Sequence, residues 1–217
     1  MKQAKPNLLT FDIEGFFEAS QDIFDVPESY LSDPIEHQAI EENTVEILDL
    51  LDDQCQKDTF FILGRIARDN KNLVRRIAEQ GHEIACHSME HRRLYNYDSA
   101  QVRSNLKRAK QYLEEASGKE VIGFRAPDFS ITKSNLWVFD ILQELGFVYD
   151  SSVYPTSLHD AFGIKDFPDT PFRLPNGLIE FPMSTARIMN QNVPFGGGGY
   201  LRLYPLISHK IFLQHAQ

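Results

Sequence analysis

Residues 59–87 read TFFILGRIARDNKNLVRRIAEQGHEIACH, and this stretch decides the class of fold. Thr59–Leu63 is a short apolar run of β-type residues that ends at a glycine, and His82–His87 is a second such run. Between them, the spacing of apolar residues predicts a helix over Lys71–Gln80, closed by Gly81, which suits the left-handed cap position. Strands joined by a crossover helix lie parallel, so the stretch predicts an α/β fold.

The same alternation continues on both sides of this stretch. Further strands are predicted over 7–12, 121–125, 147–150 and 178–182, and helices over 41–56, 99–117, 135–145 and 205–214, with a long acidic loop before residue 41 and a glycine-rich loop at 196–199. This order fits an open doubly wound sheet or a closed barrel, and in both, ligands bind at the carboxyl ends of the strands. The polar residues predicted to end strands are Asp12, Glu14, His87, Arg125 and Asp150.

The composition indicates one folded domain over residues 1–217. The formal net charge of −9, with Lys and Arg scattered along the chain, argues against nucleic acid as a partner. No apolar run approaches the roughly 20 residues of a membrane span, and the polar start MKQAKPN lacks the apolar core of a secretion signal, so we expect a cytoplasmic protein. The oligomeric state is left open by the sequence.

The strongest candidate for a metal site is His87-Ser-Met-Glu-His91. Two imidazoles four residues apart face the same way if the segment after the strand turns helically, and both can then reach one ion. The alternative is a chance pair on a solvated helix. Cys86 is a buried, reduced cysteine in the simplest interpretation; a thiolate ligand is the other, but adjacent strand residues point to opposite faces.

Asp12-Ile13-Glu14 supplies two carboxylates at one strand end, because residues two apart on a strand project to the same face. Two histidines and one carboxylate leave open positions on an ion for water and substrate, and the second carboxylate is then free to act as a base. The alternative is a solvated acidic loop, since further acids follow at Glu18, Asp22 and Asp25.

Two further strand ends carry candidate residues. Arg125, in Arg125-Ala-Pro127, is suited to pair with a base carboxylate and lower its pKa, or else is a surface arginine before a turn. Asp150, in Tyr149-Asp-Ser-Ser152, is suited to hold a catalytic histidine or to cap the turn that follows.

Together these motifs resemble the polysaccharide deacetylase family, carbohydrate esterase family four. The matching segments occur in the family's order: LLTFDIEG at 8–15, TFFILG at 59–64, HSMEH at 87–91, FRAPDF at 124–129 and YDSS at 149–152. PFGGGGYLRLYP at 194–205 further resembles the branch found in exopolysaccharide-synthesis loci. The resemblance implies a distorted (β/α) barrel that removes N-acetyl groups from the sugars of a polysaccharide or its precursor, with an N-acetylated glycan as substrate.

The resemblance also implies roles for the residues. Glu14, His87 and His91 would hold a divalent metal ion, for which Zn²⁺ is the first expectation. Asp12 would take the proton from the attacking water. The family's first motif has adjacent aspartates, so an exchange of roles between Asp12 and Glu14 is the alternative. The remaining assignments are Arg125, which orients the base, Asp150, which partners the acid, and Pro127, Phe129 and Tyr200, which contact substrate.

The acid in this family is a histidine on a late strand, and no such strand is predicted here. Leu213-Gln-His215 matches the Leu-x-His pattern of that motif, but the residues around it follow helical spacing. His209 is a weaker candidate. The sequence therefore predicts a domain that lacks its last strands. Two other functions stay open: a metal-dependent amidase for another C–N bond, and a non-catalytic protein of glycan binding or assembly.

Overall fold

The structure is a computed structural model that describes residues 8–205 except 28, 159–162 and 190. The chain divides into two compact units. The first comprises residues up to 91 together with 105–121, and the second comprises 92–104 and the residues from 122 onward.

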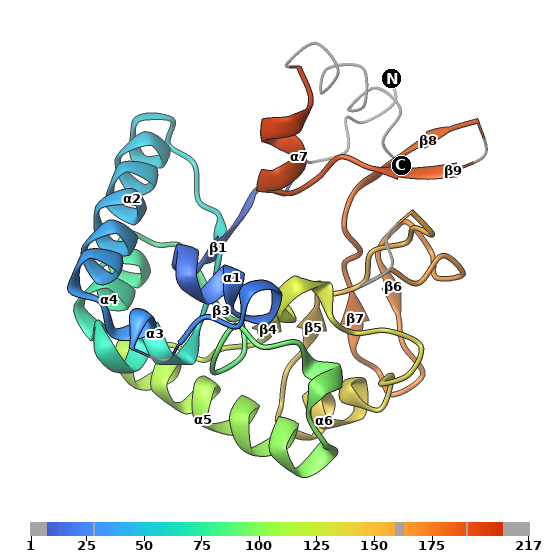
Figure 1. Cartoon of the computed structure of the whole chain (residues 1–217), viewed down its shortest axis with the longest axis horizontal. Coiled ribbons are helices and arrows are strands. Elements are labelled where there is room, and N and C mark those ends of the chain that lie inside the picture. The colour runs from blue at the N-terminus through green and yellow to red at the C-terminus, as the bar shows by residue number, and fades with distance from the viewer. Residues whose placement is uncertain (1–7, 28, 159–162, 190, 206–217) are drawn as a thin grey trace. The chain divides into compact units, whose positions relative to one another are not determined.

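Three parallel strands form the centre of the first unit, and Figure 1 shows them with α2 and α4 on one side. They are β1 (Thr10–Ile13), β2 (Thr59–Ile62) and β3 (Glu83–Cys86), in that order, and Asp12 lies in register with Phe61. Phe60, Phe61 and Ile62 are buried. The predicted parallel arrangement of these strands is confirmed.

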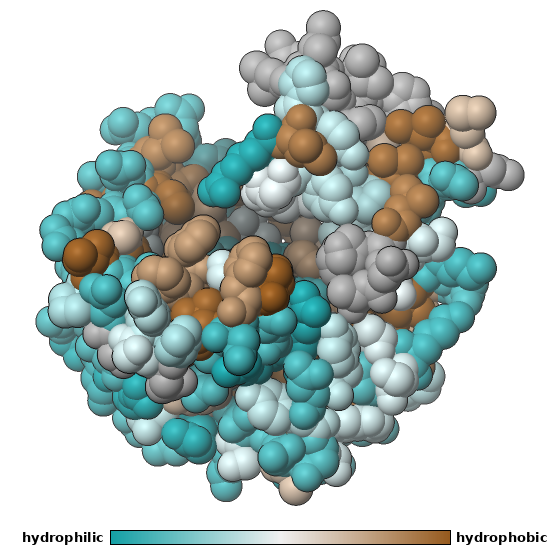
Figure 2. Space-filling view, viewed as in Figure 1, coloured by the Kyte–Doolittle hydropathy of each residue, from teal (hydrophilic) through white to brown (hydrophobic). Residues whose placement is uncertain are grey.

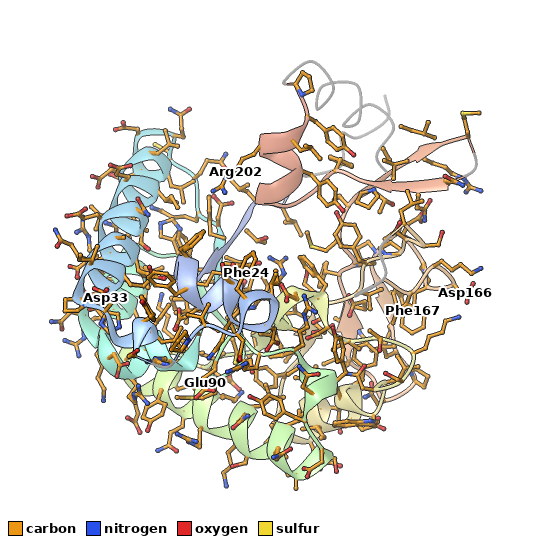
Figure 3. The ribbon with its side chains drawn as sticks, in the orientation of Figure 1. Phe24, Asp33, Glu90, Asp166, Phe167 and Arg202 are labelled. Carbon is orange, nitrogen blue, oxygen red and sulfur yellow. The ribbon has the colours of Figure 1, made fainter. Side chains whose placement is uncertain are left out.

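Helices join these strands. They are α2 (Pro34–Asp53), α3 (Gly64–Asp69) and α4 (Lys71–Glu79), and α5 (Ser99–Ser117) follows β3. The helices α2, α4 and α5 were predicted, whereas α3 was not. The helix α2 begins seven residues before the predicted start, because Asp33, labelled in Figure 3, accepts a hydrogen bond from Ile35 N at 2.8 Å and Pro34 suits the first turn. Gly81 has φ +88°, which confirms the left-handed position after α4.

The acidic segment after β1 contains a helix where the sequence predicted only a loop. This helix, α1 (Phe16–Phe24), begins at Gly15, whose N–H donates to Glu18 Oε2 at 3.0 Å. Its buried residues are polar, whereas Phe16, Ile23 and Phe24 are exposed, and Figure 2 shows apolar atoms gathered over α1. A helix with this inverted pattern gives no apolar periodicity facing a core.

In the second unit, short strands again lie side by side. The parallel strands are β4 (Gly123–Phe124), β5 (Tyr149–Asp150) and β7 (Ile179–Glu180), and β6 (Phe172–Arg173) pairs antiparallel with β7. A separate hairpin pairs β8 (Thr185–Ile188) with β9 (Gln191–Pro194). The strands β4, β5 and β7 lie within predicted ranges, whereas β6 and the hairpin were missed.

The helices of this unit partly differ from the prediction. The helix α6 (Val138–Glu144) is within its predicted range. Single-turn 3-10 helices cover Leu94–Asn96 and Pro127–Phe129 in this unit, and another covers Tyr30–Ser32 in the first unit. The helix α7 (Gly198–Leu203) begins inside the glycine run, which was predicted as a loop. The helix predicted over 205–214 falls almost wholly outside the described residues, as do His209 and His215. Within the part of the chain described, no helix is long and apolar enough to cross a membrane.

Candidate metal centre

Glu14, His87 and His91 bring three ligand atoms together in the first unit. Glu14 Oε2 lies 2.7 Å from His91 Nε2 and 3.3 Å from His87 Nε2, and one ligand atom from each residue lies within 4.8 Å of the others. Both imidazoles are buried, and the Glu14 side chain is 25% exposed. Two imidazoles and one carboxylate that converge in this way could hold a metal ion.

The ends of neighbouring strands position these side chains. Glu14 directly follows β1 and His87 directly follows β3, whose register is continued by the hydrogen bond from His87 N to Ile62 O at 2.9 Å. The segment 87–91 is a bend rather than the helical turn considered from the sequence, because Ser88 has φ +71°. The imidazoles converge through this left-handed residue.

Backbone hydrogen bonds from α3 hold this bend. Gly64 N donates to Ser88 O at 2.8 Å, and Arg65 N donates to Met89 O at 3.0 Å. These are the first N–H groups of α3, which lack partners within the helix itself. The start of one short helix therefore fixes the segment that presents both imidazoles.

The charge on Glu14 fits a ligand role. Burial raises the pKa of its carboxyl group, but hydrogen bonds to His87 and His91 and the charge on these rings outweigh burial, so the pKa lies well below the ordinary value. Both Nε2 atoms and the buried Glu14 Oε2 face one point, where a bound cation would take the place of the protons that the imidazoles share with Glu14. Two neutral imidazoles and one carboxylate form a donor set that can bind a divalent cation.

Two other candidates lie near this group. Asp12 is half-buried within β1, and among the described residues the group with ligand geometry contains Glu14 rather than Asp12. Cys86 is fully buried, and burial raises the pKa of its thiol to about 12, so it is a neutral thiol at ordinary pH.

The sequence reasoning missed two buried residues beside this site. Glu18 was grouped with solvated acids, yet it is 4% exposed; burial raises the pKa of its carboxyl group. Arg65, also buried, has its Nε 3.9 Å from Glu18 Oε1. The signal available in the sequence was Gly15 followed three residues later by Glu18, which is the spacing of a helix capping box.

Arg125 is a buried residue of the second unit, not the surface arginine of the alternative. Its Nε donates to Ser151 O at 3.2 Å and its guanidinium donates to Ser151 Oγ at 3.0 Å. Asp12 belongs to the first unit, and each of the two residues is described in its own unit. Orientation of Asp12 by Arg125 therefore stays a prediction.

Asp150 ends β5 with its side chain fully buried. It accepts hydrogen bonds from Ser152 N at 3.0 Å and Ser152 Oγ at 2.6 Å. Asp150 therefore caps the turn that follows β5, as one of the two interpretations of the sequence expected. Glu180, which the sequence analysis did not select, lies in register with Asp150 on β7 and is also fully buried. The available signal was a glutamate inside the predicted strand 178–182.

The residues predicted to contact substrate belong to an aromatic cluster of the second unit. Phe129 packs edge-on against Tyr154 at 5.4 Å between ring centroids, and Tyr154 contacts Tyr200 at 6.5 Å. Tyr200 stacks on Tyr204 at 6.0 Å. Pro127 is buried at the start of the turn that carries Phe129. The structure thus groups all three predicted residues within one unit.

Comparisons with known proteins identify the family. Residues 3–149 match the model of the polysaccharide deacetylase family, and residues 151–217 match a domain of unknown function, DUF3473. A chitooligosaccharide deacetylase of Sinorhizobium fredii is 46% identical over 48 residues, which are 22% of each chain. A peptidoglycan-N-acetylglucosamine deacetylase of Bacillus cereus is 33% identical over 95 residues, or 44% of this chain and 34% of that one. The matches thus span a minor part of these relatives.

A solved structure extends the likeness to most of the chain. The crystal structure of a Mycobacterium smegmatis protein assigned to the polysaccharide deacetylases superposes with a TM-score of 0.64 and 26% identity. It covers 90% of this chain and 68% of that one, and it confirms the predicted α/β fold class of the deacetylase type. On the match over residues 3–149, the chain belongs to the polysaccharide deacetylase family, followed by a DUF3473 segment.

Proposed function

We propose that this chain is a metal-dependent hydrolase that removes N-acetyl groups from the sugars of a polysaccharide or its precursor. The observation that carries the proposal is the convergence of Glu14, His87 and His91 at the ends of β1 and β3. Family membership supports the same reaction, because similar proteins include a chitooligosaccharide deacetylase and a peptidoglycan-N-acetylglucosamine deacetylase.

Glu14, His87 and His91 would hold one divalent ion, and we propose Zn²⁺, because two imidazoles and a carboxylate suit this ion. When bound, such an ion supplies Lewis acidity to an amide carbonyl and lowers the pKa of water. The bend at Ser88 keeps both Nε2 atoms aimed at Glu14 Oε2 without further movement.

Asp12 is proposed as the base that takes a proton from the attacking water. It lies on β1, two residues before the ligand Glu14, and it is half-buried, so its carboxylate retains access to solvent. By the family resemblance, Arg125 orients this base and Asp150 serves the step in which the departing sugar amine is protonated.

The aromatic cluster of the second unit is proposed to bind the glycan. Phe129 and Tyr200 offer rings, and Pro127 fixes the turn before Phe129. Aromatic rings combine a large apolar face with a polar edge, which suits sugar rings. A cytoplasmic role on a precursor in exopolysaccharide synthesis is our proposal for the setting, on the resemblance of residues 194–205 alone.

Acetate release from N-acetylglucosamine oligomers, measured together with bound metal, tests the proposal. Asp12→Asn is expected to keep its metal and to lose about 10²–10⁴-fold in acetate release, the usual effect of removing a general base. Glu14→Gln is expected to lose both metal and release, and Asp49→Asn, an exposed aspartate of α2, is the matched control.

Two outcomes would correct this account. If Asp12→Asn loses metal while Glu14→Gln keeps it, the two roles are exchanged. If metal-loaded wild-type protein binds the oligomers but releases no acetate, deacetylation is wrong for this chain and a glycan-binding role takes its place.

A further inference from the structure

Asp150 and Glu180 place two carboxyl groups side by side in the interior of the second unit. They are register partners on the parallel strands β5 and β7, which Figure 1 shows as neighbours, and both are 0% exposed. Partners in register on adjacent parallel strands project to the same face, so the two carboxyl groups share one buried environment. Two negative charges there would be costly, because burial and mutual repulsion both oppose ionisation.

The hydrogen bonds show which carboxyl group carries the charge. Asp150 accepts from Ser152 N and Ser152 Oγ, so both of its oxygens have donors. Glu180 Oε1 accepts from Val153 N at 3.0 Å, whereas Glu180 Oε2 is buried and has no donor from the described residues. A proton on Glu180 Oε2 removes this deficit, because the neutral acid donates a hydrogen bond to Asp150.

An arginine lies on the chain next to each outer neighbour strand of the pair, β4 and β6. Arg125 follows β4, and its charge lowers the pKa of both carboxyl groups; Arg173 on β6 lies opposite Ile179 and donates to Gly177 O. Burial nevertheless raises the pKa of Asp150 and raises that of Glu180 well above its ordinary 4.5, and the charge and hydrogen bond of Asp150 raise the pKa of Glu180 further. One positive charge near two acids leaves room for one negative charge.

We propose that Glu180 is a positioning residue for Asp150, and that the two groups share one proton at neutral pH. The inference rests on the proposed function, in which Asp150 serves the acid step. Glu180 lies in the DUF3473 segment and Asp150 lies just before it. The proposal therefore gives this segment a chemical role, because its glutamate supplies the neutral acid that fixes the Asp150 carboxylate.

The shared proton makes folding stability depend on pH. The pKa of Glu180 is raised in the folded chain, so the stability from its neutral form is complete below the ordinary value of 4.5 and is lost as pH rises through the raised pKa. Glu180→Gln keeps an N–H donor for Asp150 but does not titrate. We therefore expect the variant to lose less stability than the wild type as pH rises above 4.5.

Infrared difference spectroscopy at neutral pH tests the shared proton without any need for activity. We expect the carbonyl band of a protonated carboxylic acid in the wild type. Its intensity should fall by the contribution of one carboxyl group in Glu180→Gln and stay unchanged in Glu46→Gln, where Glu46 is an exposed residue of α2. An equal band in wild type and Glu180→Gln would overturn the proposal.

A second variant protects the test in case Glu180→Gln does not fold. Asp150→Asn removes the negative charge beside Glu180, so the acid band should disappear at lower pH than in the wild type. A band that titrates at the same pH in Asp150→Asn and wild type would show that the two groups do not share a proton.

The positioning role has its own readout in acetate release. For Glu180→Gln we expect kcat to fall with an unchanged KM, and the alkaline limb of the kcat profile to move to higher pH. An unaltered kcat profile would refute the positioning role. If the wild type releases no acetate, the proposed function fails and the positioning role fails with it, while the infrared result still decides the shared proton.

Discussion

Glu14 lies one residue beyond β1, where its carboxylate is shielded from water yet faces two imidazoles. Its neighbour Ile13 is 5% exposed and points into the core, so the alternation of the strand separates a packing residue from a residue of the candidate metal group. The same alternation separates Cys86, which is fully buried, from His87 in the metal group. Adjacent residues thus have different roles at both strand ends.

The two cysteines should react very differently with an alkylating reagent. Cys55 is exposed, whereas Cys86 is buried and its thiol has a pKa of about 12, so Cys86 presents almost no accessible thiolate. Iodoacetamide at about pH 8 should modify only Cys55 in the folded chain and both residues in denaturant, as read by peptide mass spectrometry. The control Cys55→Ser should remain unmodified when folded; rapid labelling of Cys86 there would contradict the described burial.

For single residues, the sequence predicted those that belong to recognisable motifs at strand ends. It missed polar residues whose only distinguishing feature is that they are buried. His87, His91 and Glu14 were predictable because strand ends and spacing bring them together. Glu18 and Glu180 were not, because a buried and a solvated glutamate look alike in a sequence. Only the neighbours in space distinguish the two cases.

The first residues of α3 hold the bend at residues 87–91. Gly64 N bonds Ser88 O, and a Cβ at Gly64 would lie 2.6 Å from Ala109 Cα and 2.9 Å from Met89 Sδ. The backbone of α5 leaves no room for a side chain there. This close approach explains why a glycine begins α3.

Gly64→Ala should therefore destabilise the chain by about 1–3 kcal/mol, the range for overpacking a tight interior. Displacement of Met89 should also weaken metal binding. Gly199→Ala, which meets open space within 4 Å, is the matched control and should stay within about 0.5 kcal/mol of wild type. Denaturant unfolding measures the stability of both variants. Equal unfolding midpoints for Gly64→Ala and wild type would contradict the close approach.

Among the elements, apolar periodicity found the longer ones that face a core and missed the short helix α3 and the elements that expose their apolar residues. The helices α4 and α5 and the strands β1 to β3 bury apolar residues and were predicted. The helix α1 buries Glu18, Ser20 and Gln21 while Phe16, Ile23 and Phe24 are exposed, so it was missed although its apolar residues recur at helical spacing. The hairpin of β8 and β9 alternates too weakly between buried and exposed residues for its sequence to predict it.

For the whole molecule, the order of strands and helices was enough to predict the α/β class, and the ordered motifs were enough to predict the family. The sequence predicted one domain over residues 1–217, whereas residues 151–217 match the model of a second family. The proposed chemistry uses both segments: the ligands come before residue 92, and Glu180 comes from the later one.

Bound metal per chain, measured by elemental analysis, tests the central claim most directly. Wild-type protein resupplied with Zn²⁺ should hold about one ion per chain. His87→Ala and His91→Ala should each lose that ion while remaining folded, and His37→Ala, an exposed histidine of α2, should keep it. A folded wild type without metal after resupply, or metal retained at full occupancy in both ligand variants, would contradict a metal centre at Glu14, His87 and His91.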